Sequence, residues 1–401
     1  MKKALILTNQ SDFLWKFELE NVLLLQSLGF IIHYASNSAE EGYHYDPCDL
    51  DRMGVIYHDI PIARSPYMWR MNFEALRRLM DIVENEKIDL IHCHTPVGGV
   101  LGRLAGFFSK RHPAVIYTAH GFHFYKGAPL WNNVLYRAVE QLLAPLSDIL
   151  IVINREDFAA AQKMRLKKGG RVCYVPGVGL DLDKFRAADP AERAAMRERL
   201  GIRPDDFFIL SVGELNRNKN HVTAMRAVLK LKSGSALRGR RLVYGICGDG
   251  YFMNEARQYA AGLGLSETVR FFGYQREMRG YYGAADVTVF PSIREGLGMS
   301  GLESLAMGVP VVASDNRGSR EYMNNGVNGY VCAPQDADGF ASGIRKIMEM
   351  TEAERERMAE CCRRSAQRFS KERTVRRMFE IYQEIALRDL QPASTDQSES
   401  L

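Results

Sequence analysis

Short apolar runs alternate with stretches of helical apolar spacing along most of the chain. In the first half, apolar runs predict buried strands at residues 4–8, 30–35, 54–58, 88–92, 114–118, 149–153 and 172–175. Between them, apolar residues recur at helical spacing, as in residues 17–28 and 73–83. Because strands that are separated by helices pair in parallel, this half predicts a doubly wound α/β domain.

The second half repeats this arrangement without repeating the sequence. Strands are predicted at residues 208–212, 242–247, 269–272, 287–290, 309–313 and 329–332. Helices are predicted between them, for example over 224–231 and 254–263. The chain is therefore predicted to hold two Rossmann-like domains, each with a doubly wound parallel sheet.

The predicted domain boundaries follow from the segments that interrupt this alternation. Residues 1–176 form the first domain, and residues 177–189, rich in glycine and aspartate, form an interdomain linker. The second domain runs over 190–373 and opens with a charged helix. A helical apolar stripe predicts a final helix over 374–390, and the polar tail 391–401 is expected to be disordered.

Length and composition are those of a soluble two-domain protein. The chain has 401 residues, of which 46% are hydrophobic and 25% charged. No apolar run approaches the length needed to span a bilayer. The first residues are apolar over too short a stretch for a signal peptide, and they are interpreted as the first strand.

Cysteine usage and net charge narrow the function classes. The seven cysteines are scattered, their number is odd, and several lie in predicted strands. This favours reduced thiols in the cytoplasm over a disulfide framework. The net charge is +5 and the isoelectric point is near 8.7. This mild basic excess suits anionic substrates or an anionic membrane surface, and it is too small to indicate nucleic-acid binding.

Two glutamates flank a predicted strand–turn–helix connection. Glu295 follows the strand at 287–290, and Glu303 falls in the first turn of the next helix. Ligands bind at the carboxyl ends of such strands, where carboxylates accept hydrogen bonds from sugar hydroxyls and bare amides hold phosphate. The turn is expected to bring its backbone close to the ligand, with substrate-binding residues Gly296, Leu297, Gly298 and Met299. An ordinary connection with two solvated glutamates is the alternative.

The segment from Glu295 through Glu303 to the following Gly-Val-Pro-Val-Val run resembles the E-x7-E signature of family 4 glycosyltransferases. The resemblance implies the GT-B fold, in which two Rossmann-like domains face a cleft and a C-terminal helix crosses back to the first domain. It implies that Glu303 holds the ribose of a nucleotide sugar, and that Glu295 acts in catalysis on hydroxyls of the transferred sugar. It also implies that no metal and no cofactor is required.

A second motif follows the predicted strand at 208–212. Gly213 permits a tight turn, and Arg217 and Lys219 can reach a diphosphate. The family carries a Gly-Arg-Leu…Lys motif here, whose cations neutralise the donor diphosphate. Lys219 matches the lysine of this motif, but Glu214 stands at the arginine position. Arg217 is therefore the candidate for the second cation, and solvated loop charges are the alternative.

Histidines end two strands of the first domain. His120 is followed by glycine, as in the family, where this histidine faces the transferred sugar and is assigned a catalytic role. A structural histidine is the alternative. His92 and His94 raise the question of zinc, but no closing pair with ligand spacing lies near them in the sequence. Their segment is expected to form a loop on the acceptor side. The Asp181-x-Asp183 pair matches a metal motif by chance and is assigned to the hinge.

Loops at residues 248–250 and 273–274 fall where the family holds the nucleotide base, largely through backbone groups. Tyr274 and Arg276 are the side chains named there. The first loop, residues 9–16, departs from the family because it contains no glycine. This departure leaves open how the first domain contacts the sugar or the acceptor.

Residues 92–103 and 117–126 resemble a bacterial branch of the family that builds exopolysaccharide, capsule or lipid-linked oligosaccharide. The resemblance implies a retaining transfer of a hexose or N-acetylhexosamine from a UDP-sugar or another nucleotide sugar. The acceptor would be a polysaccharide or a glycan on undecaprenyl diphosphate, in the cytoplasm or at the inner face of the cell membrane. Aromatic and basic residues at 68–71, 103–111 and 163–168 suit peripheral membrane contact, with solvated helix faces as the alternative.

Three other functions are alternatives to glycosyl transfer. A UDP-sugar epimerase of the same fold would turn over its substrate without an acceptor. A non-catalytic nucleotide-sugar-binding protein would have no need of His120 and Lys219 together with both glutamates. A dinucleotide oxidoreductase requires G-x-G-x-x-G after the first strand, and residues 8–12 carry no such glycines.

Overall fold

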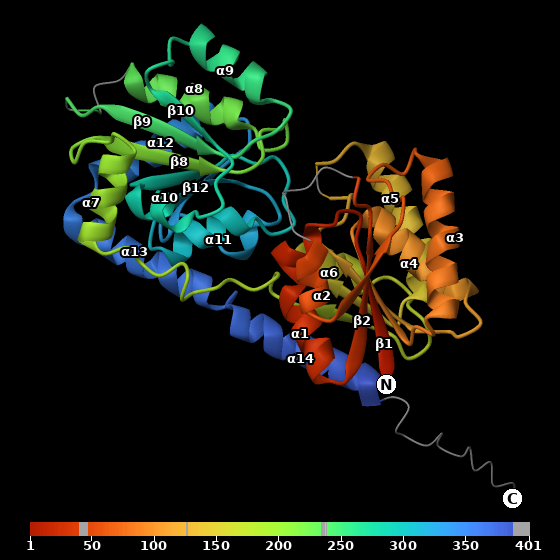
Figure 1. Ribbon diagram of the computed structural model, residues 1–401. Helices are drawn as coiled ribbons and strands as arrows, with labels where there is room; N and C mark the ends of the chain where they lie inside the picture. The colour runs from red at the N-terminus through yellow and green to blue at the C-terminus, as the bar shows by residue number, and fades with distance from the viewer. Residues whose placement is uncertain (40–46, 126, 234–236, 238, 388–401) are drawn as a thin grey trace, which may run out of the picture. The chain divides into compact units, whose positions relative to one another are not determined.

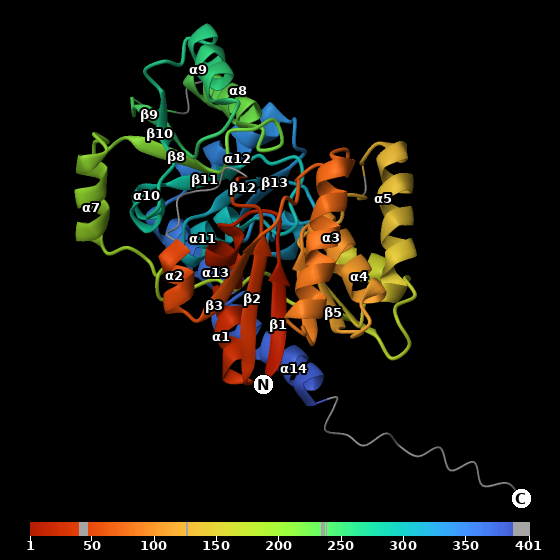
Figure 2. The same ribbon diagram turned by 45° about the vertical axis from the view of Figure 1, so that its right-hand side comes forward.

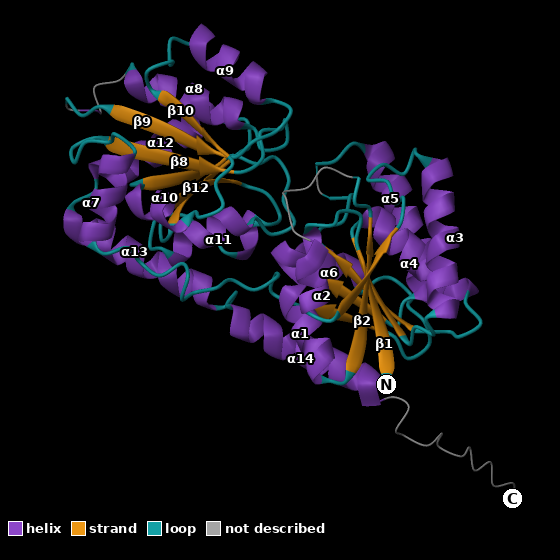
Figure 3. Ribbon diagram, viewed as in Figure 1, coloured by secondary structure: helices purple, strands orange, loops and turns teal. Residues whose placement is uncertain are grey.

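The computed structural model describes residues 1–39, 47–125, 127–233, 237 and 239–387, and it shows two compact units (Figures 1 and 3). Unit 1 combines Met1–Val178 with the C-terminal segment that begins at Glu372, and unit 2 is Gly179–Lys371. Each unit is built on one parallel sheet, so the prediction of two doubly wound α/β domains is confirmed.

The sheet of unit 1 has seven strands in the order β3-β2-β1-β4-β5-β6-β7. The strands are β1 (Lys2–Leu7), β2 (Phe30–Ser36), β3 (Val55–Asp59), β4 (Leu90–His94), β5 (Ala114–Ala119), β6 (Ile149–Val152) and β7 (Arg171–Tyr174). β1 pairs with β4 in parallel, with Ala4 opposite Leu90 and Leu7 opposite Cys93. The order of the strands therefore reverses between β1 and β4.

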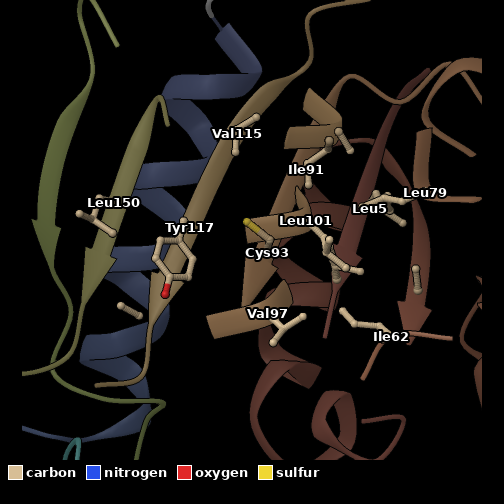
Figure 4. Close-up of a cluster of buried hydrophobic side chains, with 14 of the residues drawn as sticks. Leu5, Ile62, Leu79, Ile91, Cys93, Val97, Leu101, Val115, Tyr117 and Leu150 are labelled. Carbon is tan, nitrogen blue, oxygen red and sulfur yellow. The ribbon is translucent and has the colours of Figure 1, made fainter. Parts of the chain in front are cut away.

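Helices cover both faces of this sheet. They are a π-helical turn (Leu14–Glu18), α1 (Leu19–Ser27), α2 (Pro47–Arg52), α3 (Trp69–Asn85), α4 (Pro96–Phe108), α5 (Leu130–Leu143), α6 (Arg155–Ala161) and α14 (Lys371–Leu387). α3, α4 and α5 lie on one face, with α4 in the middle (Figures 1 and 2). Figure 4 shows the buried cluster on this face, including Leu5, Ile91 and Val115 from three strands and Leu101 from α4.

α4 lies unusually close to the sheet because of its glycines. A Cβ atom on Gly99 would come within 2.3 Å of the Tyr117 ring, and one on Gly102 within 2.6 Å of the Cys93 side chain. The same helix buries the guanidinium of Arg103, which donates to Glu140 of α5 at 2.9 Å. Close helix–sheet packing and one buried ion pair thus link α4 to its neighbours.

The final helix packs on unit 1, as the GT-B resemblance implies. Tyr382 of α14 shares a 2.8 Å hydrogen bond with His92 of β4. Lys2 donates to the carbonyl oxygen of Ala386 at 2.7 Å. The side chains of Met378, Ile381, Tyr382 and Ile385 complete the core on the face opposite α4.

Unit 2 repeats the doubly wound pattern with six strands in the order β10-β9-β8-β11-β12-β13. The strands are β8 (Phe207–Val212), β9 (Leu242–Cys247), β10 (Val269–Gly273), β11 (Val287–Phe290), β12 (Val311–Ser314) and β13 (Gly329–Cys332). The helices are α7 (Pro190–Arg199), α8 (His221–Lys232), α9 (Met253–Gly262), α10 (Arg279–Ala284), α11 (Met299–Ala306), α12 (Ala337–Glu349) and α13 (Glu352–Gln367). The strand order reverses between β8 and β11.

Two predicted strands are displaced by two residues for a local reason. The prediction for β4 began at Ile88, but the Ile88 amide donates to Val83 and closes α3. The prediction for β12 began at Val309, whose amide donates to Ser304 at the end of α11, and Pro310 has no amide proton for the ladder. The displacement at β4 matters for function, because it places His94 inside the strand, whereas the predicted strand ended at His92.

The six cysteines that the structure describes are free thiols, and Cys93, Cys173 and Cys247 are buried, as predicted. Within the described residues, no helix has the length and apolar character that a membrane span requires.

Candidate active site

The sequence-predicted residues of unit 2 gather along the carboxyl edge of its sheet. Gly213, Arg217 and Lys219 follow β8, and Glu295 with the turn 296–299 follows β11. The strand order reverses between β8 and β11, so the connections that follow these two strands run in opposite directions. Doubly wound proteins bind their ligands in the crevice that forms at such a point. Tyr274 and Arg276 follow β10, at the outer edge of the same sheet, and both are exposed.

Lys219 and Glu295 form an ion pair across this reversal point. The Lys219 Nζ atom lies 2.6 Å from Glu295 Oε1, and the two side chains are 22% and 14% exposed. Their backbones are tied together as well, because the Ile293 amide donates to the Asn218 carbonyl at 2.8 Å. Asn218 Nδ2 donates to the Arg294 carbonyl at 2.9 Å. The cation and the acid are therefore fixed relative to each other before any ligand binds.

Three asparagines hold the β8–α8 connection, and the sequence analysis did not single them out. Asn216 accepts from the Lys219 amide at 2.9 Å. Asn220 adopts a left-handed backbone conformation, with a φ of 54°. Its side-chain Nδ2 atom donates to the carbonyl oxygens of Pro291 and Pro334 at 3.1 and 2.6 Å. The signal was available as Asn-x-Asn-x-Asn over residues 216–220, since asparagine tolerates left-handed backbone and bonds to neighbouring chain.

Glu303 lies on α11 and is oriented by a tyrosine from α10. Tyr282 is fully buried, and its hydroxyl donates to Glu303 Oε2 at 2.8 Å. Burial raises the pKa of Glu303 above its ordinary value, and burial together with the neighbouring acid raises the pKa of Tyr282. Tyr282 therefore keeps its proton and acts as a fixed donor. It precedes Glu303 by twenty-one positions and carries no local motif that could have revealed it.

Packing inside unit 2 requires glycine at Gly298, before α11, and at Gly301, inside that helix. Gly298 has a φ of 89°, and a Cβ atom there would lie 2.5 Å from the Phe290 ring. A Cβ atom on Gly301 would lie 2.4 Å from the Tyr322 hydroxyl oxygen. The sequence analysis assigned Gly298 to close approach of the backbone to a ligand, but in the structure glycine is already required there by the Phe290 ring. Leu297 is buried, so its side chain is not available to a ligand.

The connections after β8, β9 and β10 contact one another directly. The Gly248 amide donates to the Gly273 carbonyl at 2.8 Å, and the Leu215 amide donates to Asp249 at 2.8 Å. A Cβ atom on Gly248 would lie 1.9 Å from the Gly213 carbonyl oxygen, which leaves space for glycine alone. The glycines at 213 and 248 thus allow these connections to meet. Tyr274 is the first residue of the connection after β10.

The second cation of the site has two candidates. The Arg217 side chain is exposed, and its backbone amide donates to the Tyr251 hydroxyl at 3.3 Å. Arg317, which the sequence analysis missed, is buried in the connection after β12, and its Nε atom donates to the Glu295 carbonyl at 3.3 Å. The structure therefore places Arg317, and not Arg217, in direct contact with the glutamate motif.

In unit 1, His120 belongs to a buried cluster near the reversal point of the sheet. His94 Nδ1 lies 3.1 Å from His120 Nε2 and 3.3 Å from Glu18 Oε1. Glu18 ends the π-helical turn, which forms within the connection that has no glycine. Phe13 from this connection packs against both imidazoles, with ring centroids 5.7 Å from His94 and 5.2 Å from His120. The glycine-free loop therefore encloses the histidines, a role that the sequence did not reveal.

Burial makes this cluster electrically neutral near pH 7. It lowers the pKa of His92 to about 3 and that of His120 to about 4, and it lowers the pKa of His94 well below its ordinary value. It raises the pKa of Glu18 to about 8. The imidazoles are therefore neutral, each with one N–H donor and one acceptor nitrogen, and the Glu18 carboxyl keeps its proton. These groups interact through hydrogen bonds rather than as charges.

The sequence analysis found no third ligand near His92 and His94, and the structure supplies one. One ligand atom each of Glu18, His92 and His94 lies within 4.8 Å of the others. Both ring nitrogens of His92 are hydrogen-bonded, to Tyr382 and to Thr118, each at 2.8 Å. A cation held by this group would have to displace one of those two partners.

Two doubly wound units in one chain, with a last helix that packs on the first unit, are the architecture of the GT-B fold. The family model "Glycosyl transferases group 1" matches residues 192–364, and the model "Glycosyltransferase Family 4" matches residues 24–184. A Bacillus subtilis protein that carries the name glycosyltransferase EpsD is 37% identical over 384 residues, which are 95% of this chain and 97% of that one. The chain therefore belongs to the family 4 glycosyltransferases and is an enzyme of that kind.

One more distant relative and one solved structure are also similar to this chain. The Escherichia coli UDP-Gal:alpha-D-GlcNAc-diphosphoundecaprenol alpha-1,3-galactosyltransferase is 26% identical over 280 residues, covering 69% of this chain and 71% of that one. The crystal structure of Anabaena HepE in complex with UDP superimposes with a TM-score of 0.73 and 18% identity, covering 96% of this chain and all of that one. This structural likeness supports the fold.

Proposed function

We propose that this glycosyltransferase moves a hexose or N-acetylhexosamine from a UDP-sugar to a lipid-linked or polysaccharide acceptor, with retention of anomeric configuration, in bacterial surface glycan synthesis. The observation that carries the proposal is the Lys219–Glu295 pair at the reversal point of unit 2, beside the Tyr282–Glu303 pair. The Lys219 cation suits a diphosphate, and the carboxylates of Glu295 and Glu303 suit sugar hydroxyls. The name of one relative, which specifies UDP-Gal, and the complex of one structural neighbour with UDP support the choice of UDP.

In the proposed reaction, the bond between the sugar C1 and the diphosphate oxygen breaks, and the acceptor hydroxyl attacks the same face of C1. The hydroxyl proton passes to an oxygen of the leaving phosphate, so no covalent enzyme intermediate is needed. Lys219 and the amides that open α11 stabilise the charge that develops on the diphosphate. Arg317 or Arg217 supplies the second cation.

The remaining groups position the donor. Glu303 accepts hydrogen bonds from the ribose hydroxyls, with its carboxyl held by Tyr282. Glu295 accepts from hydroxyls of the transferred sugar, and Lys219 holds its orientation. Tyr274, which is exposed after β10, is assigned to the nucleotide base by the resemblance to the family. The resemblance to the family assigns His120 to a sugar hydroxyl or to the leaving oxygen.

For the acceptor, we favour a glycan carried on undecaprenyl diphosphate. The support is the Escherichia coli relative, whose name specifies a diphosphoundecaprenol acceptor. Such an acceptor is embedded in a bilayer, so the enzyme would act in the cytoplasm at the inner face of the cell membrane. Exposed aromatic side chains on unit 1, among them Trp69 and Phe107, agree with peripheral contact.

The test is a screen of UDP- and GDP-sugars with and without lipid-linked acceptors, which follows release of the nucleotide and the anomeric configuration of the product. Transfer that depends on an acceptor supports the proposal. Isomerisation of a UDP-sugar without an acceptor would indicate the epimerase, and tight UDP binding without turnover would indicate a binding protein. We expect Glu303→Ala to weaken donor binding and His120→Ala to lower turnover more than binding. Full activity in both variants would refute the site.

A further inference from the structure

α5 of unit 1 turns its apolar side chains toward solvent. Leu130, Trp131 and Leu142 are 84%, 81% and 76% exposed, and Val134 and Leu135 are also exposed. The two buried residues of this helix are Glu140 and Leu143. A surface helix of a globular protein normally shows the opposite pattern, with apolar residues inward and polar residues outward. The outward face of α5 is therefore built to be covered by something apolar.

Specific polar contacts hold α5 in this orientation. Glu140 accepts from Arg103 of α4 at 2.9 Å and from the Tyr117 hydroxyl at 3.2 Å. At the start of the helix, Asn133 accepts from the Tyr125 amide at 2.9 Å and donates to the Ala128 carbonyl at 3.3 Å. Because a buried ion pair fixes one face of the helix inward, the apolar face cannot rotate toward the core without stranding that charge.

The start of α3 adds a second exposed apolar group on the same side of the sheet. Tyr67, Met68, Trp69 and Phe73 are exposed there. α3 and α5 lie on either side of α4 in both views (Figures 1 and 2). We call these nine side chains the α3–α5 face, namely Tyr67, Met68, Trp69, Phe73, Leu130, Trp131, Val134, Leu135 and Leu142. Over the described part of unit 2, the large exposed apolar side chains are Tyr251, Tyr274, Ile293 and Val327.

Exposed arginines outnumber exposed acids around the α3–α5 face, although Asp81 further along α3 is also exposed. In α5, all of whose residues the structure describes, Arg137 is the one exposed charged side chain. Near the start of α3, Arg64, Arg70 and Arg77 are exposed, whereas Glu74 is neutralised by Arg78 at 2.6 Å. Tryptophan, tyrosine and leucine ringed by arginine are the side chains that partition into the headgroup region of an anionic bilayer.

We propose that the α3–α5 face is the surface with which this enzyme docks on anionic phospholipid membranes. The inference rests on the proposed function, in which the acceptor lies in a bilayer, and it adds the surface that meets that bilayer. The segments that the sequence suggested, 68–71, 103–111 and 163–168, did not include α5, which carries most of the exposed apolar side chains. The outward leucines of α5 could not be distinguished from core residues by spacing alone.

The tryptophans make the proposal directly testable. The chain has three tryptophans, and two of them, Trp69 and Trp131, lie on the α3–α5 face. The full chain is mixed with vesicles made of equal parts of phosphatidylcholine and phosphatidylglycerol, and co-sedimentation and tryptophan fluorescence are measured. We expect binding with a blue shift of the emission, and weaker binding to phosphatidylcholine alone or at high salt.

Variants locate the contact. Trp131→Ser combined with Leu142→Ser is expected to lower vesicle binding by at least roughly tenfold. Tyr251→Ser, at a site on unit 2 that is 69% exposed, serves as the control and is expected to bind vesicles like the parent. Circular dichroism and thermal unfolding confirm that each variant is folded. Arg70→Gln combined with Arg137→Gln is expected to weaken binding to the anionic vesicles alone.

The outcomes separate the docking surface from the proposed reaction. If the full chain does not bind vesicles, or if the Trp131→Ser, Leu142→Ser variant binds as well as the parent, the docking proposal is wrong. If that variant instead dissociates a dimer detected by light scattering, the face is an interface between two copies. We expect the variant to keep its turnover on a short, water-soluble acceptor and to lose it on a vesicle-embedded acceptor. Loss of vesicle binding in a protein without transferase activity would leave docking standing and refute the reaction.

Discussion

The ion pair between Lys219 and Glu295 can be dissected by a double-mutant cycle. Lys219→Met removes the charge and keeps most of the side-chain length, and Glu295→Gln removes the charge of the acid and keeps its shape. At 2.6 Å, the Coulomb attraction at an effective dielectric constant of about 20 is roughly 6 kcal/mol. Desolvation and the remaining exposure of 22% and 14% offset most of it, which leaves a coupling free energy of about 1–3 kcal/mol.

The cycle separates a structural role from a catalytic one. Each single variant strands one partly buried charge and is expected to destabilise unit 2 by about 1–3 kcal/mol, whereas the double variant should recover part of that loss. Catalysis should not recover, because Lys219 acts on the diphosphate. We expect Lys219→Met and the double variant to lose about 10²–10³ in kcat/KM.

The assay must report on unit 2, because a chain with two compact units need not unfold in one transition. Hydrogen exchange of peptides from β8 and β11 in denaturant gives that local stability. Lys230→Met with Asp338→Asn is the matched control, since this pair lies 2.8 Å apart on the same unit but is 47% and 81% exposed. Its coupling should be about 0–1 kcal/mol. A Lys219–Glu295 coupling no larger than the control, or a double variant with parental turnover, would refute the reasoning.

Three further results are expected. Tyr282→Phe removes the donor to Glu303 and should weaken UDP binding about fivefold to tenfold by calorimetry, while secondary structure is unchanged. Glu140→Gln leaves Arg103 buried without its counter-charge and should accelerate hydrogen exchange in α5 by an amount that corresponds to about 3–5 kcal/mol, so unchanged exchange would contradict the anchoring role. Because burial raises the pKa of Glu18 to about 8, its contribution to the stability of unit 1 is complete below about pH 4.5 and is lost as the pH rises through 8. Glu18→Gln should therefore gain stability relative to the parent by about 1.4 kcal/mol per pH unit between pH 5 and 8, measured by hydrogen exchange of β4, and a difference that is independent of pH would contradict the raised pKa.

The strands could be predicted because both faces of each sheet are covered. A strand buried on both faces is a continuous apolar run, and such runs mark the central strands, for example β6 and β11. The boundaries are less certain, because an apolar residue at the end of a run can belong to a helix terminus. Ile88 and Val309 look like the first residues of strands, but their amides close the preceding helices.

The candidate site could be predicted where it is local in sequence. The Glu295–Glu303 segment and the Lys219 loop each have a strand before and a helix after, so their position at the carboxyl edge follows from the fold class. Their partners come from other elements and have no local signal. Tyr282 lies on α10 and Arg317 after β12, and each reaches the site through tertiary packing alone.

Both units place an acid beside a base where the strand order reverses, and the two pairs differ in charge for a physical reason. In unit 2, Glu295 and Lys219 keep some contact with solvent and lie 2.6 Å apart, so they form an ion pair. In unit 1, Glu18 and His94 are 2% and 1% exposed and 3.3 Å apart, and burial raises the pKa of the acid and lowers that of the imidazole. The proton stays on the acid, and this pair is neutral. A neutral pair adds no net charge against a departing diphosphate, and what it provides is orientation, through the 3.1 Å contact of His94 with His120. In the proposed reaction the electrostatic stabilisation therefore comes from unit 2, and the histidines of unit 1 act by position.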